Sequence, residues 1–202
     1  MYRITPSNRF ILASSSPRRR ELLAACGIMP EIVVPNCDET AESGETPVRL
    51  VERLAALKAG CVAEQHREAW VLGGDTVVVL GGEILGKPAD RAHAVEMLQR
   101  MQGTTHEVWG AFALVRRQSG EVLVASHRSR VTLVAMSTAR IEAYVATGEP
   151  LDKAGSYALQ GIGAAFVESV EGSHSNVVGL NLAAVLRALE ERGVIELRGA
   201  GR

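Results

Sequence analysis

The residue of this chain best suited to chemistry is an aspartate that follows two glycines. Asp75 comes after Gly73-Gly74, inside a run otherwise made of valine, leucine and tryptophan. A carboxylate in such a run is expected to be partly buried, and glycines let a ligand or metal approach the backbone closely. Two interpretations are open: a metal-binding carboxylate or base that orients an attacking water, and an aspartate that caps a β-bulge.

A second candidate is the segment Ser14-Ser15-Ser16-Pro17-Arg18-Arg19-Arg20, which follows the apolar run 10–13. The pattern predicts a helix with Ser16 as N-cap and Pro17 as its first residue. A helix start carries unpaired N–H groups and partial positive charge, so arginines there are unfavourable unless an anion is present. The pattern favours a phosphate site; a solvated basic turn, with Arg19 extending past the core edge, is the alternative.

Two lysines in other segments are further cationic candidates. Lys58 flanks the apolar seam of its expected helix, and an ordinary solvated lysine is the competing interpretation. A hairpin turn at Gly81-Gly82 would place Lys87 opposite Thr76. Strict pleating puts Lys87 and Asp75 on opposite faces of the sheet, so this pairing gives a shared site only modest support.

The segment 151–161 (LDKAGSYALQG) is dense in glycine and polar side chains. That composition suits a binding loop that a ligand approaches closely, and Lys153 brings a positive charge to it. Gln160 offers a paired amide donor and acceptor that match the edge of a base. A tight structural turn is the alternative interpretation.

The elements that must position these residues mix hairpin and helix signals without strict alternation. An α/β fold with a mixed sheet and flanking helices is predicted, and a plain doubly wound sheet is disfavoured. The run from Trp70 to Leu80 is expected to be interrupted at residues 73–76, and the tail from 196 to 202 to be frayed. Helices are expected over about 17–26, 46–61, 90–103, 137–148 and 180–193.

Composition narrows the classes of protein. The 202 residues suit one domain over residues 1–202, the hydrophobic fraction is 47%, and the net charge of −1 lacks the basic excess of a nucleic-acid binder. No membrane span, signal peptide, histidine-based metal site or nucleotide-binding glycine fingerprint is recognised. Three cysteines without metal-ligand spacing indicate the cytoplasm; Cys26 and Cys61 are expected to be buried structural thiols.

Together these segments resemble the Maf family of nucleoside triphosphate pyrophosphatases, over about Phe10 to Leu189. The order and spacing of the motifs are more specific than any one motif. Asn181 and His174 depart from the family pattern, which commonly has Pro and Tyr there. The motifs are Ala13-Ser14-Ser15-Ser16-Pro17-Arg18-Arg19, 52–59, Gly74-Asp75-Thr76-Val77, Gly86-Lys87-Pro88, Thr105-His106, Asp152-Lys153-Ala154-Gly155 and Asn176-Val177-Val178-Gly179-Leu180.

The resemblance implies an α/β protein of two lobes around a central cleft, similar to the inosine triphosphatase fold and often a homodimer. It also implies hydrolysis of a nucleoside triphosphate to the monophosphate and pyrophosphate, with Mg²⁺ or Mn²⁺ as the divalent metal. The subgroup that acts on dTTP and UTP has the arrangement seen around Gln160. The subgroup that acts on methylated guanine nucleotides generally carries Glu at that position.

Residue roles follow from the same resemblance. Asp75 would be the catalytic acceptor of the water proton, and it would share the metal with Glu39. Thr76, Gln160 and Arg18 correspond to positions that sort substrates by base. The phosphate cleft would be lined by Ser14, Arg18, Arg19, Lys58, Lys87 and Lys153.

Two other functions stay open. The substrates could be modified or damaged pyrimidine nucleotides instead of dTTP and UTP. A protein of another class, a regulatory module linked to cell-division arrest, would bind nucleotides without turning them over. Pyrophosphate release separates this module from the enzyme.

Overall fold

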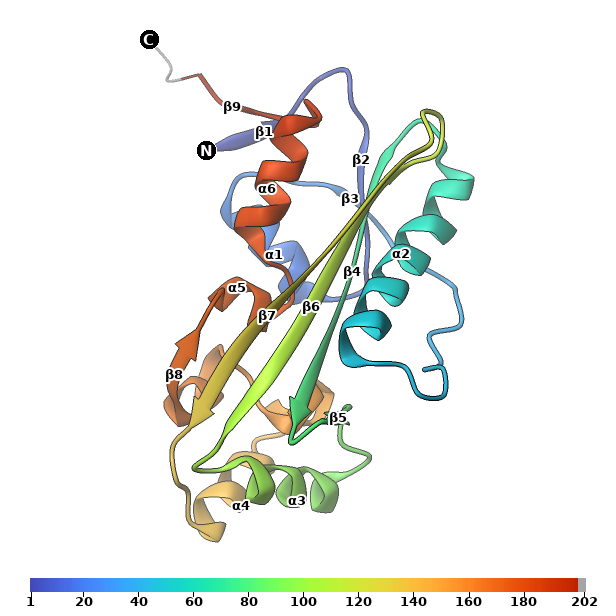
Figure 1. The fold of residues 1–202 in the computed structure, drawn as a ribbon. Coiled ribbons are helices and arrows are strands. Elements are labelled where there is room, and N and C mark those ends of the chain that lie inside the picture. Colours follow the sequence, from blue (N-terminus) through green and yellow to red (C-terminus); the bar gives the residue numbers. More distant parts are fainter. Residues whose placement is uncertain (200–202) are drawn as a thin grey trace. The chain divides into compact units, whose positions relative to one another are not determined.

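The computed structural model describes residues 1–199, which form strands, α-helices and short 3₁₀ helices in mixed order (Figure 1). The strands are Tyr2–Ile4 (β1), Phe10–Ala13 (β2), Glu31–Val33 (β3), Trp70–Leu80 (β4), Glu83–Leu85 (β5), Thr105–Arg116 (β6), Glu121–Leu133 (β7), Val167–Glu171 (β8) and Ile195–Leu197 (β9). The α-helices are Pro17–Ala25 (α1), Pro47–Gln65 (α2), Arg91–Met101 (α3), Thr138–Ala146 (α4), His174–Val178 (α5) and Leu182–Glu191 (α6). The 3₁₀ helices are Glu149–Asp152 (η1), Ala154–Ser156 (η2) and Gly161–Phe166 (η3).

The main sheet is mixed, as the sequence predicts. Its strand order is β3-β2-β4-β6-β7-β8, with β5 paired to β4, while β1 and β9 form a separate pair. Strand β2 runs parallel to β3 and β4, whereas β5 and β8 are antiparallel to their partners. The α/β fold class is therefore confirmed.

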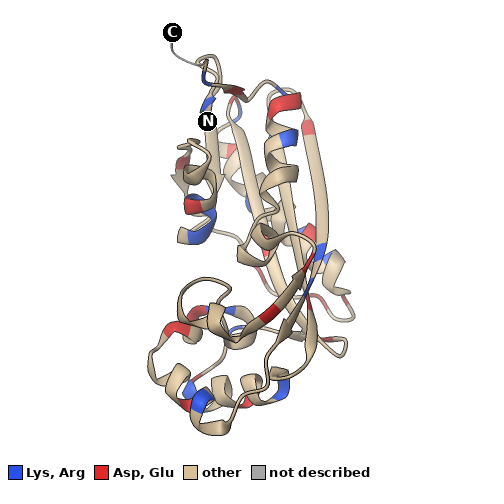
Figure 2. Ribbon diagram, turned by 90° about the vertical axis from the view of Figure 1, so that its left-hand side faces the viewer, with Lys and Arg blue, Asp and Glu red and all other residues tan. Residues whose placement is uncertain are grey.

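The chain divides into two compact units. The first contains residues 1–75, residues 110–127 and the described residues from Gly179 onward, and the second contains residues 76–109 and 128–178. Strands β4, β6 and β7 contribute residues to both units. Lysine and arginine are interspersed with aspartate and glutamate in each unit (Figure 2).

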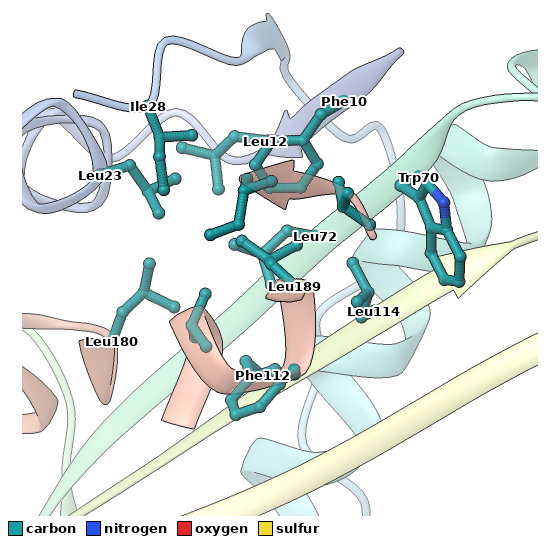
Figure 3. Packing of buried hydrophobic residues seen from close by; sticks show 14 of the residues in the cluster. Phe10, Leu12, Leu23, Ile28, Trp70, Leu72, Phe112, Leu114, Leu180 and Leu189 are labelled. Atoms are coloured by element: carbon teal, nitrogen blue, oxygen red, sulfur yellow. The ribbon is translucent and has the colours of Figure 1, made fainter. Parts of the chain in front are cut away.

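In the first unit, α1 connects β2 to β3 and α2 connects β3 back to β4. Parallel strands joined by right-handed crossovers in opposite directions place their helices on opposite faces of the sheet. Leu12, Leu72 and Leu114 of the sheet pack with Leu23 of α1 and Leu189 of α6 in one apolar cluster (Figure 3). Helix α2 covers the other face.

The second unit has its own apolar core. Met97 and Leu98 of α3 pack there with Ile141 and Tyr144 of α4. Tyr157, between η2 and η3, belongs to the same cluster. The two helices and the 3₁₀ segment therefore share one core that holds the loop from 149 to 163.

Several local predictions were wrong. Strand β4 runs without interruption through its two glycines, and helix α5 lies outside the helices expected from the sequence. Strand β9 pairs with β1, with Tyr2 opposite Leu197, so residues 196–197 are not frayed; positions 200–202 of the predicted tail lie outside the described residues. No helix in the described part of the chain is long and apolar enough to cross a membrane.

Candidate active site

A buried lysine in the first unit holds two carboxylates. The Nζ atom of Lys58 lies 2.8 Å from Oδ1 of Asp75 and 2.7 Å from Oε2 of Glu39. Lys58 is 7% exposed and Asp75 is 9% exposed. Charges this deep are tolerated when they are paired, so the interpretation of Lys58 as an ordinary solvated lysine was wrong.

The contact between Lys58 and Asp75 depends on the alternation of side chains along β4. A Cβ atom at Gly73 would lie 2.4 Å from the carbonyl oxygen of Ala55 and 2.7 Å from the amide nitrogen of Ala59. Glycine therefore lets the backbone of α2 rest directly on the strand. Asp75, two residues further along, projects to the same face and meets Lys58.

Gly74, the neighbouring glycine, is packed against groups on the opposite face of strand β4. A Cβ at Gly74 would lie 3.1 Å from Cδ2 of Leu180 and 3.4 Å from Nε of Arg19. The two glycines were expected to admit a ligand or metal. In the structure the groups that approach them are helix α2, the side chains of Leu180 and Arg19, and the carbonyl oxygen of Ala111.

Arg19 and Ser14 lie at the start of α1. The Nε atom of Arg19 donates to the carbonyl oxygen of Gly179 at 3.0 Å, and Nη1 donates to Oγ of Ser14 at 3.3 Å. Ser16 is the N-cap and Pro17 the first helical residue, as predicted, but the Ser16 side chain makes no capping bond. The serine hydroxyl that accepts from a backbone amide here is Ser14, from Ser16 N at 3.1 Å.

The three arginines differ in burial. Arg19 is buried, Arg18 is half-buried and Arg20 is exposed. Burial lowers the pKa of Arg19, while the negative charges of Asp75 and Glu39 raise it. The charges of Asp75 and Glu39, which Lys58 contacts directly, thus also act on Arg19.

The remaining candidates belong to the second unit. Lys87 is exposed just after β5, whose register places Val78 opposite Leu85. Strand β5 ends at Leu85, so Lys87 lies beyond the paired residues and not directly within the hairpin. Thr76 is half-buried and Gln160 is exposed.

Lys153 is held within its own loop. Its Nζ atom donates to the carbonyl oxygen of Glu149 at 2.7 Å and pairs with the carboxylate of Asp152. The amide of Gly155 donates to the carbonyl oxygen of Gly86 at 3.1 Å. The second unit therefore brings the segments of Lys87 and Lys153 together.

Comparison with known proteins shows which family this chain belongs to. The family described as Maf-like protein matches residues 9–192. The chain belongs to the Maf family. It is 48% identical to the dTTP/UTP pyrophosphatase of Pelotomaculum thermopropionicum over 91% of this chain and 96% of that protein. The identity is also 48% to the dTTP/UTP pyrophosphatase of Symbiobacterium thermophilum, over 96% of this chain and 99% of that protein.

Two further proteins are similar to this Maf chain. The dTTP/UTP pyrophosphatase of Myxococcus xanthus is 48% identical over 91% of this chain and 92% of that protein. The solved Ham1 protein of Staphylococcus aureus aligns with a TM-score of 0.45 and 16% identity, over 63% of this chain and 72% of that chain.

The acidic pair of this Maf protein offers oxygen donors to a cation. Oxygens of Asp75 and Glu39 already converge on one positive group, the Lys58 ammonium. Among residues 1–199, no group of three or more histidine, cysteine, aspartate or glutamate side chains is arranged to hold a metal. Magnesium is commonly bound by one or two carboxylates plus substrate phosphates, so a two-carboxylate set fits this class of ion.

Two features of the Maf protein were missed in the sequence. Burial raises the pKa of the Cys37 thiol, and contacts with Cys61 and Glu39 act in the same direction. Cys26 and Cys61 are half-buried rather than buried. Glu149 bonds to the Gln160 loop, and its position after a glycine and before a proline gives no signal of that role in the sequence.

Proposed function

We propose that this Maf protein hydrolyses dTTP and UTP to the nucleoside monophosphate and pyrophosphate. The carrying observation is the contact of buried Lys58 with buried Asp75 and with the exposed carboxylate of Glu39, which supplies a carboxylate next to fixed positive charge. Relatives that match nearly the whole chain are named dTTP/UTP pyrophosphatases, which supports the same reaction.

In the proposed reaction, a water oxygen forms a bond to the α-phosphorus and the bond from that phosphorus to the bridging oxygen breaks. Pyrophosphate leaves with the electron pair of the broken bond. Asp75 orients the water and accepts its proton. Lys58 keeps the Asp75 carboxylate in one place, because the 2.8 Å contact restrains its rotation.

The charge of the triphosphate is proposed to be balanced by basic side chains. The start of α1 provides backbone N–H groups, the Ser14 hydroxyl, Arg18 and Arg19, a set that suits phosphate oxygens. Lys87 and Lys153 are the other proposed contributors. These groups stabilise the negative charge that accumulates on the leaving oxygens.

A divalent cation, Mg²⁺ or Mn²⁺, is proposed to bind at Asp75 and Glu39. When bound, such an ion lowers the pKa of a coordinated water and neutralises phosphate charge. Lys58 would then share its two carboxylates with the ion.

Recognition of the base is assigned to Gln160, with Thr76 and Arg18. The neutral amide of Gln160 pairs with the imide and carbonyl edge of thymine or uracil, whereas a carboxylate suits the N–H edge of guanine. We place this enzyme in the cytoplasm as a homodimer, with a nucleoside triphosphate as its partner and neither a nucleic-acid polymer nor a membrane.

The test is pyrophosphate release from dTTP, UTP, CTP, GTP and methylated GTP, with Mg²⁺, with Mn²⁺ and with a chelator. We expect the fastest release from dTTP and UTP and loss of release with the chelator. Stoichiometric nucleotide binding without pyrophosphate would support the regulatory module instead. Faster release from modified pyrimidine nucleotides than from dTTP would shift the assignment to those substrates.

A further inference from the structure

The carboxylate of Glu149 is the centre of a hydrogen-bond cluster in the second unit. Its Oε1 atom accepts from the hydroxyl of Tyr144 at 2.8 Å and from the amide of Gly163 at 2.8 Å. Its Oε2 atom accepts from the amide of Ile162 at 2.9 Å. One side chain at the start of the loop thus binds the backbone at its far end.

Gln160 lies between two anchor points of this cluster. On one side, the amide of Ala158 donates to the hydroxyl of Tyr144 at 3.2 Å, and Tyr144 donates to Glu149. On the other side, Ile162 donates to Glu149 directly. The backbone of Gln160 is therefore restrained two residues before and two residues after it.

Glycine at position 161 makes this close approach possible. Its φ is +70°, and a Cβ there would lie 2.5 Å from Oε2 of Glu149. Both the left-handed backbone and the space require glycine. Glycine at position 161, next to Gln160, therefore allows the carboxylate of Glu149 to approach the backbone this closely.

The same glutamate also fixes Lys153. The Nζ atom of Lys153 donates to the main-chain oxygen of Glu149, so the side-chain cluster and the lysine share one residue. Ser156, fully buried at a φ of +58°, donates to the sulfur of Met97 at 3.0 Å. A non-glycine residue in that backbone region is held by its surroundings, as is common in ligand-binding segments.

The need to give every buried polar group a hydrogen-bond partner does not account for all of the hydrogen bonds to Glu149. Ile162 is 49% exposed, so water could serve its amide as well as Glu149 does. What the carboxylate adds at this residue is a fixed geometry between the ends of the loop. Hydrogen bonds to an ionised group are stronger and shorter than neutral ones, which suits that task.

We propose that Glu149 is the positioning residue for nucleotide selectivity, because its carboxylate restrains the backbone on both sides of Gln160, while its main-chain oxygen holds Lys153 beside the same loop. The inference rests on the proposed function, since it assigns Gln160 to the base and Lys153 to the phosphates. Glu149 itself touches neither the base nor the reacting phosphorus in this proposal.

The experiment compares the full-length wild type with Glu149→Gln, and with Glu142→Gln as a matched control. Glu142 is exposed on α4, on the same helix as Tyr144 but outside the hydrogen-bond cluster of Glu149. For Glu149→Gln we expect KM for dTTP and UTP to rise about tenfold while kcat changes less than about twofold. The preference for dTTP over GTP in kcat/KM should fall by a similar factor.

A second variant covers the case in which Glu149→Gln does not fold. Tyr144→Phe keeps the ring in the core but removes the bridge between Ala158 and Glu149. It should raise KM for dTTP in the same direction by a smaller factor. Hydrogen exchange at residues 158–163 should quicken in both variants and stay unchanged in Glu142→Gln.

Two results distinguish failure of the positioning role of Glu149 from failure of the proposed function. If the wild type releases pyrophosphate from dTTP and folded Glu149→Gln keeps its KM and selectivity, the positioning role is overturned while the proposed function stands. An equal loss of kcat/KM for every nucleotide also overturns it, since that result marks general destabilisation. If the wild type releases no pyrophosphate from any nucleotide, the proposed function fails and the inference fails with it.

Discussion

The backbone of Ala59 lies against Gly73 so closely that a Cβ atom on the glycine would be 2.7 Å from the Ala59 amide nitrogen. This contact sets the height of helix α2 above strand β4. It also decides whether the side chain at position 58 can reach Asp75, because Lys58 precedes Ala59 on the face that meets the strand.

Replacement of Gly73 by alanine should therefore disturb the contact between Lys58 and Asp75. Gly73→Ala is expected to lower the free energy of unfolding by about 2 kcal/mol or more, since the added methyl collides with backbone that cannot move alone. Pyrophosphate release should fall about tenfold or more as Lys58 is displaced. Urea unfolding and steady-state rates check the two effects.

Gly60 provides the control on the same helix. A Cβ there meets nothing within 4 Å, so Gly60→Ala should raise stability by about 0.5–1 kcal/mol without loss of activity. Equal effects of the two substitutions would contradict the packing argument.

Asp75→Asn should abolish turnover and leave the protein folded. The amide cannot accept the proton of the attacking water, while Lys58 keeps its contact with Glu39. Circular dichroism and pyrophosphate release measure the two properties, with Glu168→Gln, at an exposed position of β8, as control. Substantial remaining release by Asp75→Asn would refute the catalytic role.

Gln160→Glu should change the choice of nucleotide more than stability. Gln160 is exposed, so its replacement removes no core contact. The carboxylate loses the amide donor, and dTTP and UTP hydrolysis should weaken by about tenfold or more relative to GTP. Relative rates across the nucleotide panel give the answer, and unchanged ratios would exclude the base-reading role.

Protonation of His106 should lower the free energy of unfolding in mild acid. Burial lowers its pKa to about 4, and its Nε2 atom lies 2.7 Å from the hydroxyl of Tyr157. Since the unfolded chain takes up this proton near pH 6.5 and the folded chain near pH 4, stability falls as pH drops through that window. The loss is about 3 kcal/mol at most when the pKa shift is converted by linkage.

The test compares unfolding free energies at about pH 7 and about pH 5 for the wild type, His106→Gln and the exposed-site control His174→Gln. The difference between the two pH values should shrink in His106→Gln and persist in His174→Gln. The same pH dependence in all three proteins would show that His106 does not carry the effect.

Much of the site could be predicted where the relevant forces are local. Ser16 and Pro17 begin α1 because capping and a fixed φ act within one helical turn. The position of Arg19 on the buried side of α1, with Arg18 and Arg20 on either side of it, follows from about 100° of rotation per residue. The mixed sheet follows from hairpin signals among helix signals.

The contacts of Lys58 and Glu149 could not be predicted in this way. A lysine on a helix is solvated unless another element covers it. No residue close to position 58 in the sequence indicates that strand β4 covers this lysine. Glu149 reaches amides 13 and 14 residues away through a loop of irregular turns. The pairing of β1 with β9 joins opposite ends of the chain in the same way.

The class of fold, the family and the candidate side chains can be recognised in the sequence, because periodicity, helix caps and motif order depend on residues close together in the chain. Tertiary structure alone decided that Lys58 leaves water to join Asp75 and Glu39, and that Glu149 closes the Gln160 loop. Those choices depend on distances between segments far apart in the chain, which are set only when the helices pack on the sheet and the loop closes.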